Sequence, residues 1–483
     1  MPKKSLSQTY QKKTDREHIL DAPDTYLGSI IPEKVENWSF NDDSSKIVYK
    51  EINWVPGFYK CFDESIVNAR DHVVRMEQNN NENKQLVKSI NVTITDGVIS
   101  LMNDGDGIDI AKHPDHDIWI PELVFGHLRT STNYDKEEKK IVGGKNGFGF
   151  KLVLIYSKWG EIETVDHRRG LKYTQRFENN LSTICPPTIT KCKGKKPYTK
   201  VTYMPDYERF GISQMNDDIF KHLNKRVHDI AGITNPNVKV TFNSNLIQIK
   251  NFQQYIDLYI GSSSDTKRLY VKENDRWEYA VCLTPFQEFT QVSFVNGINT
   301  KKGGKHVDYI LNNILKKVVA LIEKKKKVKV KPTTIKEQLM LFVNCTIENP
   351  SFDSQTKENL TTNASNFGST CSVRDSFVEK LVKMGIMEQA ISINELKETK
   401  EIKKADGKKQ RTIRGIPKLI DANYAGTEKG SRCTLILCEG DSAKAGIVSG
   451  LSKEDRNLIG VYPLKGKLMN VRCETQSRIA KND

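Results

Sequence analysis

Long hydrophobic runs are missing from the sequence, and so is any segment that resembles a secretory leader. Hydrophobic residues make up 37% of the 483 residues. No apolar run approaches the roughly 20 residues that a membrane-spanning helix needs. Residues 1–10 are polar and basic and no apolar core follows them, so we expect no signal peptide. These absences predict a soluble protein of an intracellular compartment.

Cysteine pairs that could hold zinc or form a redox disulfide are missing as well. The nine cysteines are scattered, and no two of them form a CxxC motif. This spacing argues against zinc-ribbon and thioredoxin-like proteins and against a secreted disulfide scaffold. We expect most of these cysteines to be small buried side chains in a reducing environment.

Acidic residues are too few to balance the basic ones. The chain has 75 Lys and Arg against 60 Asp and Glu, a formal net charge of +15. A basic excess of this size favours polyanionic partners, because binding releases condensed counterions, and nucleic acid is the natural candidate. The alternative is a solvated basic surface without a partner.

The length predicts about three domains, and the pattern of the first part is mixed. Short β-branched runs at residues 90–95 and 98–103 flank Asp96-Gly97, a strong signal for a hairpin turn. For residues 1–260 we therefore predict an α+β sandwich, with helices over one face of a mixed sheet. Further elements are expected as a buried helix at 152–156 and strands at 201–204 and 238–242.

Residues 261–405 follow a different order of strand, helix and strand. Strands are expected at 292–295 and 339–345. Between them, apolar residues recur at three- and four-residue steps over 307–322 and mark one face of a helix. If the two strands are parallel, the segment is a right-handed βαβ unit.

Two charged segments interrupt these patterns. In residues 324–331 six of eight residues are lysine, which would suit a nuclear-import signal or a DNA-facing patch. The alternation of Val328 and Val330 with lysines favours an exposed strand with one basic face. Residues 397–414 lack apolar periodicity and predict a linker or a mobile hairpin, and we place the linker itself at 406–430.

The last unit is expected at residues 431–483. A short apolar strand at 433–438 runs into Glu439, a glycine turn and a helix that Asp441 or Ser442 would cap. A carboxylate at the carboxyl end of a strand is well placed to bind a metal ion.

Glu64, Asn68 and Asp71 carry the clearest candidate chemistry. Their i, i+4 and i+7 spacing places them on one face of a helix. Asn68 could offer its oxygen to Mg²⁺ while Glu64 orients and deprotonates an attacking water, as nucleotide hydrolysis requires. A polar outer helix face is the structural alternative.

Two glycine-containing segments could approach a nucleotide. Asn103 directly follows a strand and precedes Gly105 and Gly107, so its side chain could read a base, although a simple turn explains it equally well. In residues 143–151 four glycines precede an apolar helix start, where free backbone N–H groups bind phosphate. The segment matches neither a Walker A loop nor a dinucleotide-binding motif.

Taken in order, these motifs resemble the type IIA DNA topoisomerases of eukaryotes and their viruses. The resemblance covers nearly the whole chain, and so many independent motifs in the right order exclude coincidence. The sparse N-terminal extension is similar to the enzymes of large cytoplasmic DNA viruses. The motifs are residues 10–14, 17–20, 23–29, the Glu64 helix, 130–134, 143–151, 352–357, 439–444 and 463–467.

The resemblance implies a three-part fold and an ATP-operated gate. It implies a GHKL (Bergerat) ATPase sandwich at 1–260, a transducer α/β domain at 261–405 and the first part of a Rossmann-like TOPRIM domain at 431–483. It implies ATP and Mg²⁺ as ligands, double-stranded DNA as substrate and a homodimer. The location implied is the host cytoplasm for a viral enzyme and the nucleus for a cellular one.

The resemblance also assigns roles to single residues. Glu64 is similar to the catalytic base, Asn68 to the ligand of the ATP-bound Mg²⁺, Asn103 to the adenine contact and Glu439 to a TOPRIM Mg²⁺ ligand. Gln355, Thr356 and Lys357 resemble the family's transducer loop that reaches the γ-phosphate, with Lys357 as a catalytic residue. Other nucleotide contacts are implied for Tyr10, Ser131, Thr132, Asn133, Gly144, Lys145, Asn146, Gly147, Phe148, Gly149, Phe150 and Lys151. DNA contacts are implied for Lys301, Lys302, Lys305, Lys465 and Lys467.

The chain departs from the family pattern at two positions, and the pattern leaves two rival interpretations. His72 and Phe150 stand where Asn and Ala are expected, on the ribose side of the pocket and in the lid.

The family's second metal-binding carboxylates and its DNA-cleaving tyrosine would lie beyond Asp483, so we expect a longer polypeptide. The rivals are another GHKL ATPase clamp, of the mismatch-repair or chaperone kind, and a non-enzymatic DNA-binding scaffold.

Overall fold

The described part of the chain forms two compact units. The computed structural model describes residues 10, 12–130, 139–144, 147–286, 288–387, 390, 419–427, 429–452 and 454–464. The first unit spans residues 1–321 and 335–384, and the second spans 322–334 and 385–483. None of the helices in the described ranges is long and apolar enough to cross a membrane.

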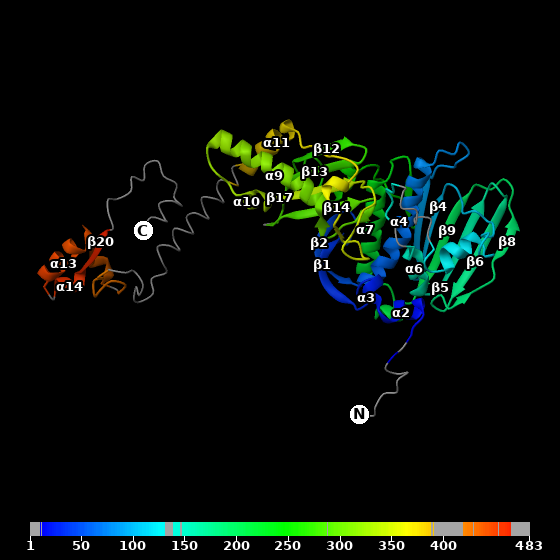
Figure 1. Ribbon diagram of the computed structural model, residues 1–483, viewed down its shortest axis with the longest axis horizontal. Helices are drawn as coiled ribbons and strands as arrows, with labels where there is room; N and C mark the ends of the chain where they lie inside the picture. The colour runs from blue at the N-terminus through cyan, green and yellow to red at the C-terminus, as the bar shows by residue number, and fades with distance from the viewer. Residues whose placement is uncertain are drawn as a thin grey trace, which may run out of the picture. The chain divides into compact units, whose positions relative to one another are not determined.

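A nine-stranded mixed sheet dominates the first part of unit one (Figure 1). Only the β10–β3 pair is parallel among its named pairs. The strand order is β11-β10-β3-β4-β9-β5-β6-β7, with β8 beside β6. The strands are β3 (Ser89–Thr95), β4 (Val98–Asp104), β5 (Ser157–Asp166), β6 (Leu171–Glu178), β7 (Thr183–Ile184), β8 (Thr188–Lys191), β9 (Tyr198–Pro205), β10 (Lys239–Phe242) and β11 (Asn245–Leu246).

The predicted hairpin between β3 and β4 is confirmed. Asp96 and Gly97 have φ angles of 50° and 77°, the positive values that a tight two-residue hairpin turn needs. The antiparallel register pairs Thr95 with Val98 and Ile90 with Asn103. The turn therefore fixes Asn103 near the far end of β4.

Helices α4 (Pro56–Gln78), α6 (Gly149–Ile155) and α7 (Asp217–Ile233) pack on this sheet. In α4, Pro56 occupies the first turn, where its missing N–H costs nothing. Phe58, Phe62 and Ile66 follow at four-residue steps and are at most 2% exposed. Burial of each such side chain contributes about 1.5–3 kcal/mol.

Smaller elements complete this part of the unit. Strands β1 (Glu33–Phe40) and β2 (Ile47–Trp54) pair antiparallel as a separate ribbon. The remaining helices are α2 (Asp15–Asp21), α3 (Pro23–Tyr26), α5 (Ile120–Gly126), η1 (Tyr207–Phe210) and α8 (Phe252–Ile260).

A five-stranded sheet of order β12-β13-β17-β14-β15 forms the second part of unit one. Strands β14 (Thr290–Val295) and β17 (Leu339–Cys345) are parallel, and helix α9 (Lys305–Lys326) connects them, as predicted. The other elements are β12 (Arg268–Asn274), β13 (Trp277–Leu283), β15 (Ile298–Asn299), β16 (Gly303–Gly304), β18 (Asn359–Leu360), η2 (Ala364–Asn366) and α11 (Asp375–Leu381). Helix α10 (Pro332–Lys336) and η3 (Val382–Ile386) each contain residues of both units.

The prediction of a basic strand at residues 324–331 is wrong. Lys324, Lys325 and Lys326 form the last turn of α9, and residues 327–331 form no strand. Lysine is a good helix former, and cations at a helix C-terminus interact favourably with the helix dipole. Lys327 has a φ of 56° and ends the helix.

Unit two contains a parallel pair of strands around a helix. Strand β19 (Thr434–Glu439) pairs parallel with β20 (Ile459–Leu464), and the helices are η4 (Gly430–Arg432), α13 (Gly440–Gly450) and α14 (Asp455–Leu458). The expected capping of α13 by Asp441 or Ser442 is wrong, because Glu439 is the N-cap residue and makes no side-chain cap bond. The charged segment at 397–414 lies outside the described residues. Of the predicted linker at 406–430 the structure describes residues 419–427, 429 and 430, where Ile420 forms an isolated bridge with Val461.

Candidate active site

A cavity of about 430 Å³ brings together most of the nucleotide-site residues predicted from the sequence. It lies beside α4 and is bounded by the end of β4, by α5, by the start of α6 and by the segment before β18. The predicted residues that line it are Glu64, Asn68, Asn103, Gly144, Gly147, Gly149, Phe150, Lys151, Gln355 and Lys357. We call it the nucleotide cavity.

Glu64 lines this cavity and contacts two lysine ammonium groups. Its Oε1 lies 3.1 Å from Nζ of Lys357 and 2.8 Å from Nζ of Lys60. Burial alone would raise the pKa of Glu64, but the Lys357 and Lys60 ammonium groups outweigh it and hold that pKa below its ordinary value. Glu64 is therefore a carboxylate at neutral pH, as a proton acceptor must be.

Lys357 reaches this position from a loop 293 residues further along the chain. It has a φ of 61°, a left-handed conformation that lysine rarely adopts, and it is 6% exposed. A lone loop lysine is normally solvated, so its burial against Glu64 requires the surrounding fold to hold it there.

The glycine-rich segment approaches α4 at two places. A Cβ on Gly149 would lie 2.6 Å from Oε2 of Glu64, so only glycine lets the start of α6 come this close without displacing the carboxylate. Upstream, the N–H groups of Gly143 and Gly144 donate to the Asp71 carboxylate at 2.9–3.0 Å. Asp71 thus anchors the glycine segment and does not line the cavity.

Lys151 is buried and bound to backbone carbonyl groups. Its Nζ donates to the carbonyl oxygens of Thr130 at 2.6 Å and of Gly147 at 2.8 Å. Burial lowers the pKa of Lys151 to about 8. The ammonium ties two chain segments beside the cavity to each other.

Residues at the end of β4 and just after it form another polar part of the cavity lining. Asn103 donates to the Asp104 carbonyl at 2.9 Å. Gly107 packs so closely that a Cβ there would lie 2.0 Å from the Val165 carbonyl oxygen. His72 also lines the cavity, and burial lowers its pKa to about 4, so the imidazole is neutral.

Several predicted residues lie elsewhere. Tyr10 is 78% exposed and, like Phe148, does not line the cavity. Thr356 lines a second cavity and bonds Ser354 at 2.8 Å. The predicted residues outside the described chain are Ser131, Thr132, Asn133, Lys145, Asn146, Lys465 and Lys467.

Several residues that line the nucleotide cavity were not predicted from the sequence, although some of them follow a recognisable helical spacing. Ser65, Ala69 and Met76 recur at helical spacing on the side of α4 that lines the cavity, so helical spacing could have found them. Val124 and Phe125 form an apolar wall and belong to the short helix α5, which no motif marks.

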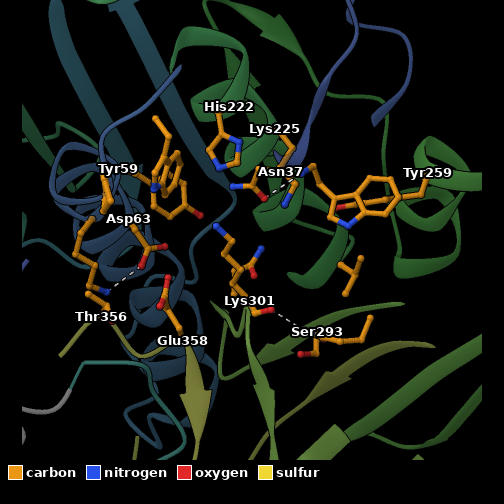
Figure 2. Close-up of a pocket in the computed structure, with 17 residues that line it drawn as sticks. Asn37, Tyr59, Asp63, His222, Lys225, Tyr259, Ser293, Lys301, Thr356 and Glu358 are labelled. Carbon is orange, nitrogen blue, oxygen red and sulfur yellow. Dashed lines mark hydrogen bonds and ion pairs between the residues drawn. The ribbon is translucent and has the colours of Figure 1, made fainter. Parts of the chain in front are cut away.

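Figure 2 shows the second cavity, of about 80 Å³, with the predicted DNA-contacting Lys301 inside it. Lys301 is an exposed residue, and its Nζ lies 5.2 Å from the centre of the Trp54 ring. Lys302 pairs with Glu358 at 2.7 Å, and Lys305 is exposed at the first residue of α9.

Glu439 is exposed at the end of β19, as the strand prediction placed it. Within the described ranges no group of three or more His, Cys, Asp or Glu side chains could hold a metal ion. Glu439 alone therefore does not form a metal site in this part of the chain.

Comparisons with known proteins identify the family. A family model described as DNA gyrase B matches residues 251–411. DNA topoisomerase 2 of Pisum sativum and that of Acanthamoeba polyphaga mimivirus are each 45% identical over at least 99% of this chain. The chain spans only 33% and 38% of their respective lengths.

Solved structures agree with this match. The ATPase region of Saccharomyces cerevisiae topoisomerase II is 40% identical, with a TM-score of 0.75, and the match covers 81% of this chain and 100% of that one. The ATPase and transducer domains of topoisomerase II from Balamuthia mandrillaris match at 39% identity and a TM-score of 0.76, over 82% of this chain and 100% of that one. These matches favour the topoisomerase interpretation over a mismatch-repair clamp, a chaperone or a scaffold. The chain therefore belongs to the type II DNA topoisomerases and contains the ATPase region of that family.

Proposed function

We propose that this chain binds ATP in the nucleotide cavity and hydrolyses it with Glu64 as the general base. The observation that carries the proposal is the buried contact between Glu64 and Lys357 at the polar end of that cavity. Glu64 would orient the attacking water and accept its proton, and Lys357 would donate to the γ-phosphate and offset its charge.

The shape and chemistry of the cavity suit a nucleotide. Ile108, Val124 and Phe125 give one part an apolar wall that suits a base, and Asn103 offers a polar contact there. At the other end, the glycine segment lets backbone approach the phosphates. The volume of about 430 Å³ lies in the range of small-molecule sites.

The residues present also fit a magnesium ion bound together with the phosphates. Asn68 offers one carboxamide oxygen on the face of α4 that lines the cavity. Mg²⁺ commonly takes one or two protein oxygens and completes its shell with water and phosphate, so a single amide oxygen suffices. When bound there, the ion would neutralise phosphate charge.

For the full-length protein we propose an ATP-operated gate that captures duplex DNA. Two copies would meet when each binds ATP and Mg²⁺, and the exposed Tyr10 would contact the partner copy's nucleotide site. The net charge of +15 and the exposed Lys302 and Lys305 support a DNA-facing surface. A non-hydrolysable ATP analogue should then double the mass seen by light scattering; an unchanged monomer mass at micromolar protein would contradict the gate.

The hydrolysis proposal is tested by ATP turnover and ATP affinity of the unaltered chain and of Glu64→Ala. We expect Mg²⁺-dependent turnover that falls by about 10²–10⁴-fold in the variant, the usual contribution of a positioned general base. ATP affinity should be retained. Near-normal turnover in Glu64→Ala would remove Glu64 from this role.

A further inference from the structure

Lys60 lies one turn before Glu64 on α4 and contacts two carboxylates. Its Nζ is 2.8 Å from Oε1 of Glu64 and 3.1 Å from Oδ2 of Asp63. Lys60 is 3% exposed, and each carboxylate residue is 4% exposed. A buried ammonium loses much of its hydration, so it is tolerated only where charged partners compensate.

Lys60 contacts Glu64 from outside the nucleotide cavity. Lys60 and Asp63 line the second cavity. Figure 2 shows Asp63 on the side of this cavity that also carries Thr356 and Glu358. Neither Lys60 nor Asp63 lines the nucleotide cavity. Any effect of Lys60 on ATP hydrolysis must therefore act through Glu64.

Asp63 connects Lys60 to the five-stranded sheet. Its Oδ1 accepts from Nε of Arg226 at 2.8 Å, and Arg226 is fully buried on α7. Nη2 of Arg226 donates at 2.7 Å to the carbonyl oxygen of Gly297, in the turn between β14 and β15. A continuous series of charged hydrogen bonds thus runs from Glu64 to this turn.

The two oxygens of Glu64 have different surroundings. Both ammonium contacts, from Lys60 and Lys357, are made to Oε1. Oε2 is the oxygen beside Gly149, at the start of the glycine-rich wall of the cavity. If Lys357 moves to a phosphate, Lys60 keeps Oε1 fixed and leaves Oε2 turned towards the cavity.

We propose that Lys60 is a positioning residue for ATP hydrolysis: it anchors Oε1 of Glu64 so that Oε2 accepts the proton. Asp63 and Arg226 fix the position of Lys60 relative to the Gly297 turn. The catalytic carboxylate is then oriented by the five-stranded sheet as well as by its own helix. This inference rests on the proposed ATPase function.

The test compares kcat, ATP affinity and the pH dependence of kcat for the unaltered chain and Lys60→Met. We expect kcat to fall about 10–10²-fold, the effect of a misplaced reacting group, while ATP affinity stays nearly constant. The acid limb of kcat should move to higher pH by about one pH unit or more, because Glu64 loses a cation that favours its charged form. Lys60→Arg keeps the positive charge, so its acid limb of kcat should lie at the same pH as in the unaltered chain.

Lys225→Met is the matched control. Lys225 is also a buried lysine in an ion pair, with Asp229 at 3.1 Å, but it does not contact Glu64. Its loss should lower the melting temperature and leave the acid limb of kcat in place. If Lys60→Met does not fold, Lys60→Gln removes the charge while keeping a hydrogen-bond donor, and the same shift of the acid limb is expected.

Two outcomes separate this inference from the proposed function. If the unaltered chain hydrolyses ATP, and Glu64→Ala does not, a normal kcat and an unmoved acid limb in the Lys60 variant overturn the positioning role alone. If the unaltered chain shows no Mg²⁺-dependent turnover, the proposed function itself fails.

Discussion

Asp63 and Glu64 are neighbouring buried carboxylates on α4, but they face different cavities and have different roles. Glu64 opens on the nucleotide cavity and holds two lysine ammonium groups at one oxygen. Asp63 lines the second cavity and is bound by Lys60 and Arg226. Two consecutive positions on one helix thus differ. Glu64 is available for chemistry in the cavity, whereas Asp63 connects α4, through Arg226 on α7, to the Gly297 turn of the five-stranded sheet.

The pKa of each carboxylate reflects these surroundings. Burial raises the pKa of Asp63, but Lys60 and Arg226 reverse this effect and lower it to about 2. A lowered pKa means that the charged form is stabilised by folding. The contribution to stability is present above the unfolded-state pKa of about 3.9 and is lost as the pH falls through about 2.

The substitution expected to have the largest effect on turnover in this comparison is at Lys357, which contacts Glu64 and not Asp63. Lys357→Met should lower kcat by about 10²–10³-fold, because the charge aimed at the phosphate is lost. Steady-state ATPase assays measure it. Stability should change little, because Glu64 keeps Lys60; a normal kcat with a large loss of melting temperature would make Lys357 a structural lysine instead.

A smaller effect is expected for Gly149→Ala. The new methyl group would lie 2.6 Å from Oε2 of Glu64 and would push the flexible end of that side chain aside. We expect kcat to fall by about tenfold, as for a modest misplacement of the base, with no loss of stability because alanine favours helices. Gly446→Ala is the control, since it adds a methyl group to a helix where no atom lies within 4 Å. Equal kcat in both variants would contradict the close approach.

The smallest effect concerns DNA. If Lys302 contacts a phosphate, Lys302→Gln should reduce the slope of log affinity against log salt by about 0.9. Lys302 would have to leave Glu358, to which it is bound at 2.7 Å. Salt-titrated binding to a duplex measures the slope; an unchanged slope would assign Lys302 to its pair with Glu358.

Local patterns predicted much of the fold. The Asp96-Gly97 turn, the Glu64 helix and the parallel β14–α9–β17 unit all follow from periodicity or turn chemistry within a short window. The lysine run was misassigned because a valine–lysine alternation suggests a strand, whereas continuation of α9 determines the structure.

The site was predicted less completely, and distance along the chain explains why. Helical spacing and glycine content pointed to Glu64, Asn68 and the glycine segment. The resemblance pointed to Lys357, but no local pattern shows that it is buried against Glu64 from 293 residues away. Pairs such as Asp63 with Arg226, 163 residues apart, depend on tertiary packing and leave no mark in a sequence window.

The most direct test of the account measures ATP turnover and melting temperature side by side for Glu64→Gln and Asp63→Asn, two near-isosteric neutralisations at adjacent positions. We predict that Glu64→Gln loses turnover by about 10²-fold or more and loses less stability than Asp63→Asn, because Lys60 keeps Asp63 and Lys357 lines the nucleotide cavity, where water can reach it. Asp63→Asn should lose about 3–5 kcal/mol of stability, because Arg226 and Lys60 lose a buried partner, with a smaller fall in turnover. The reverse pattern, with turnover lost in Asp63→Asn and stability lost in Glu64→Gln, would contradict the account.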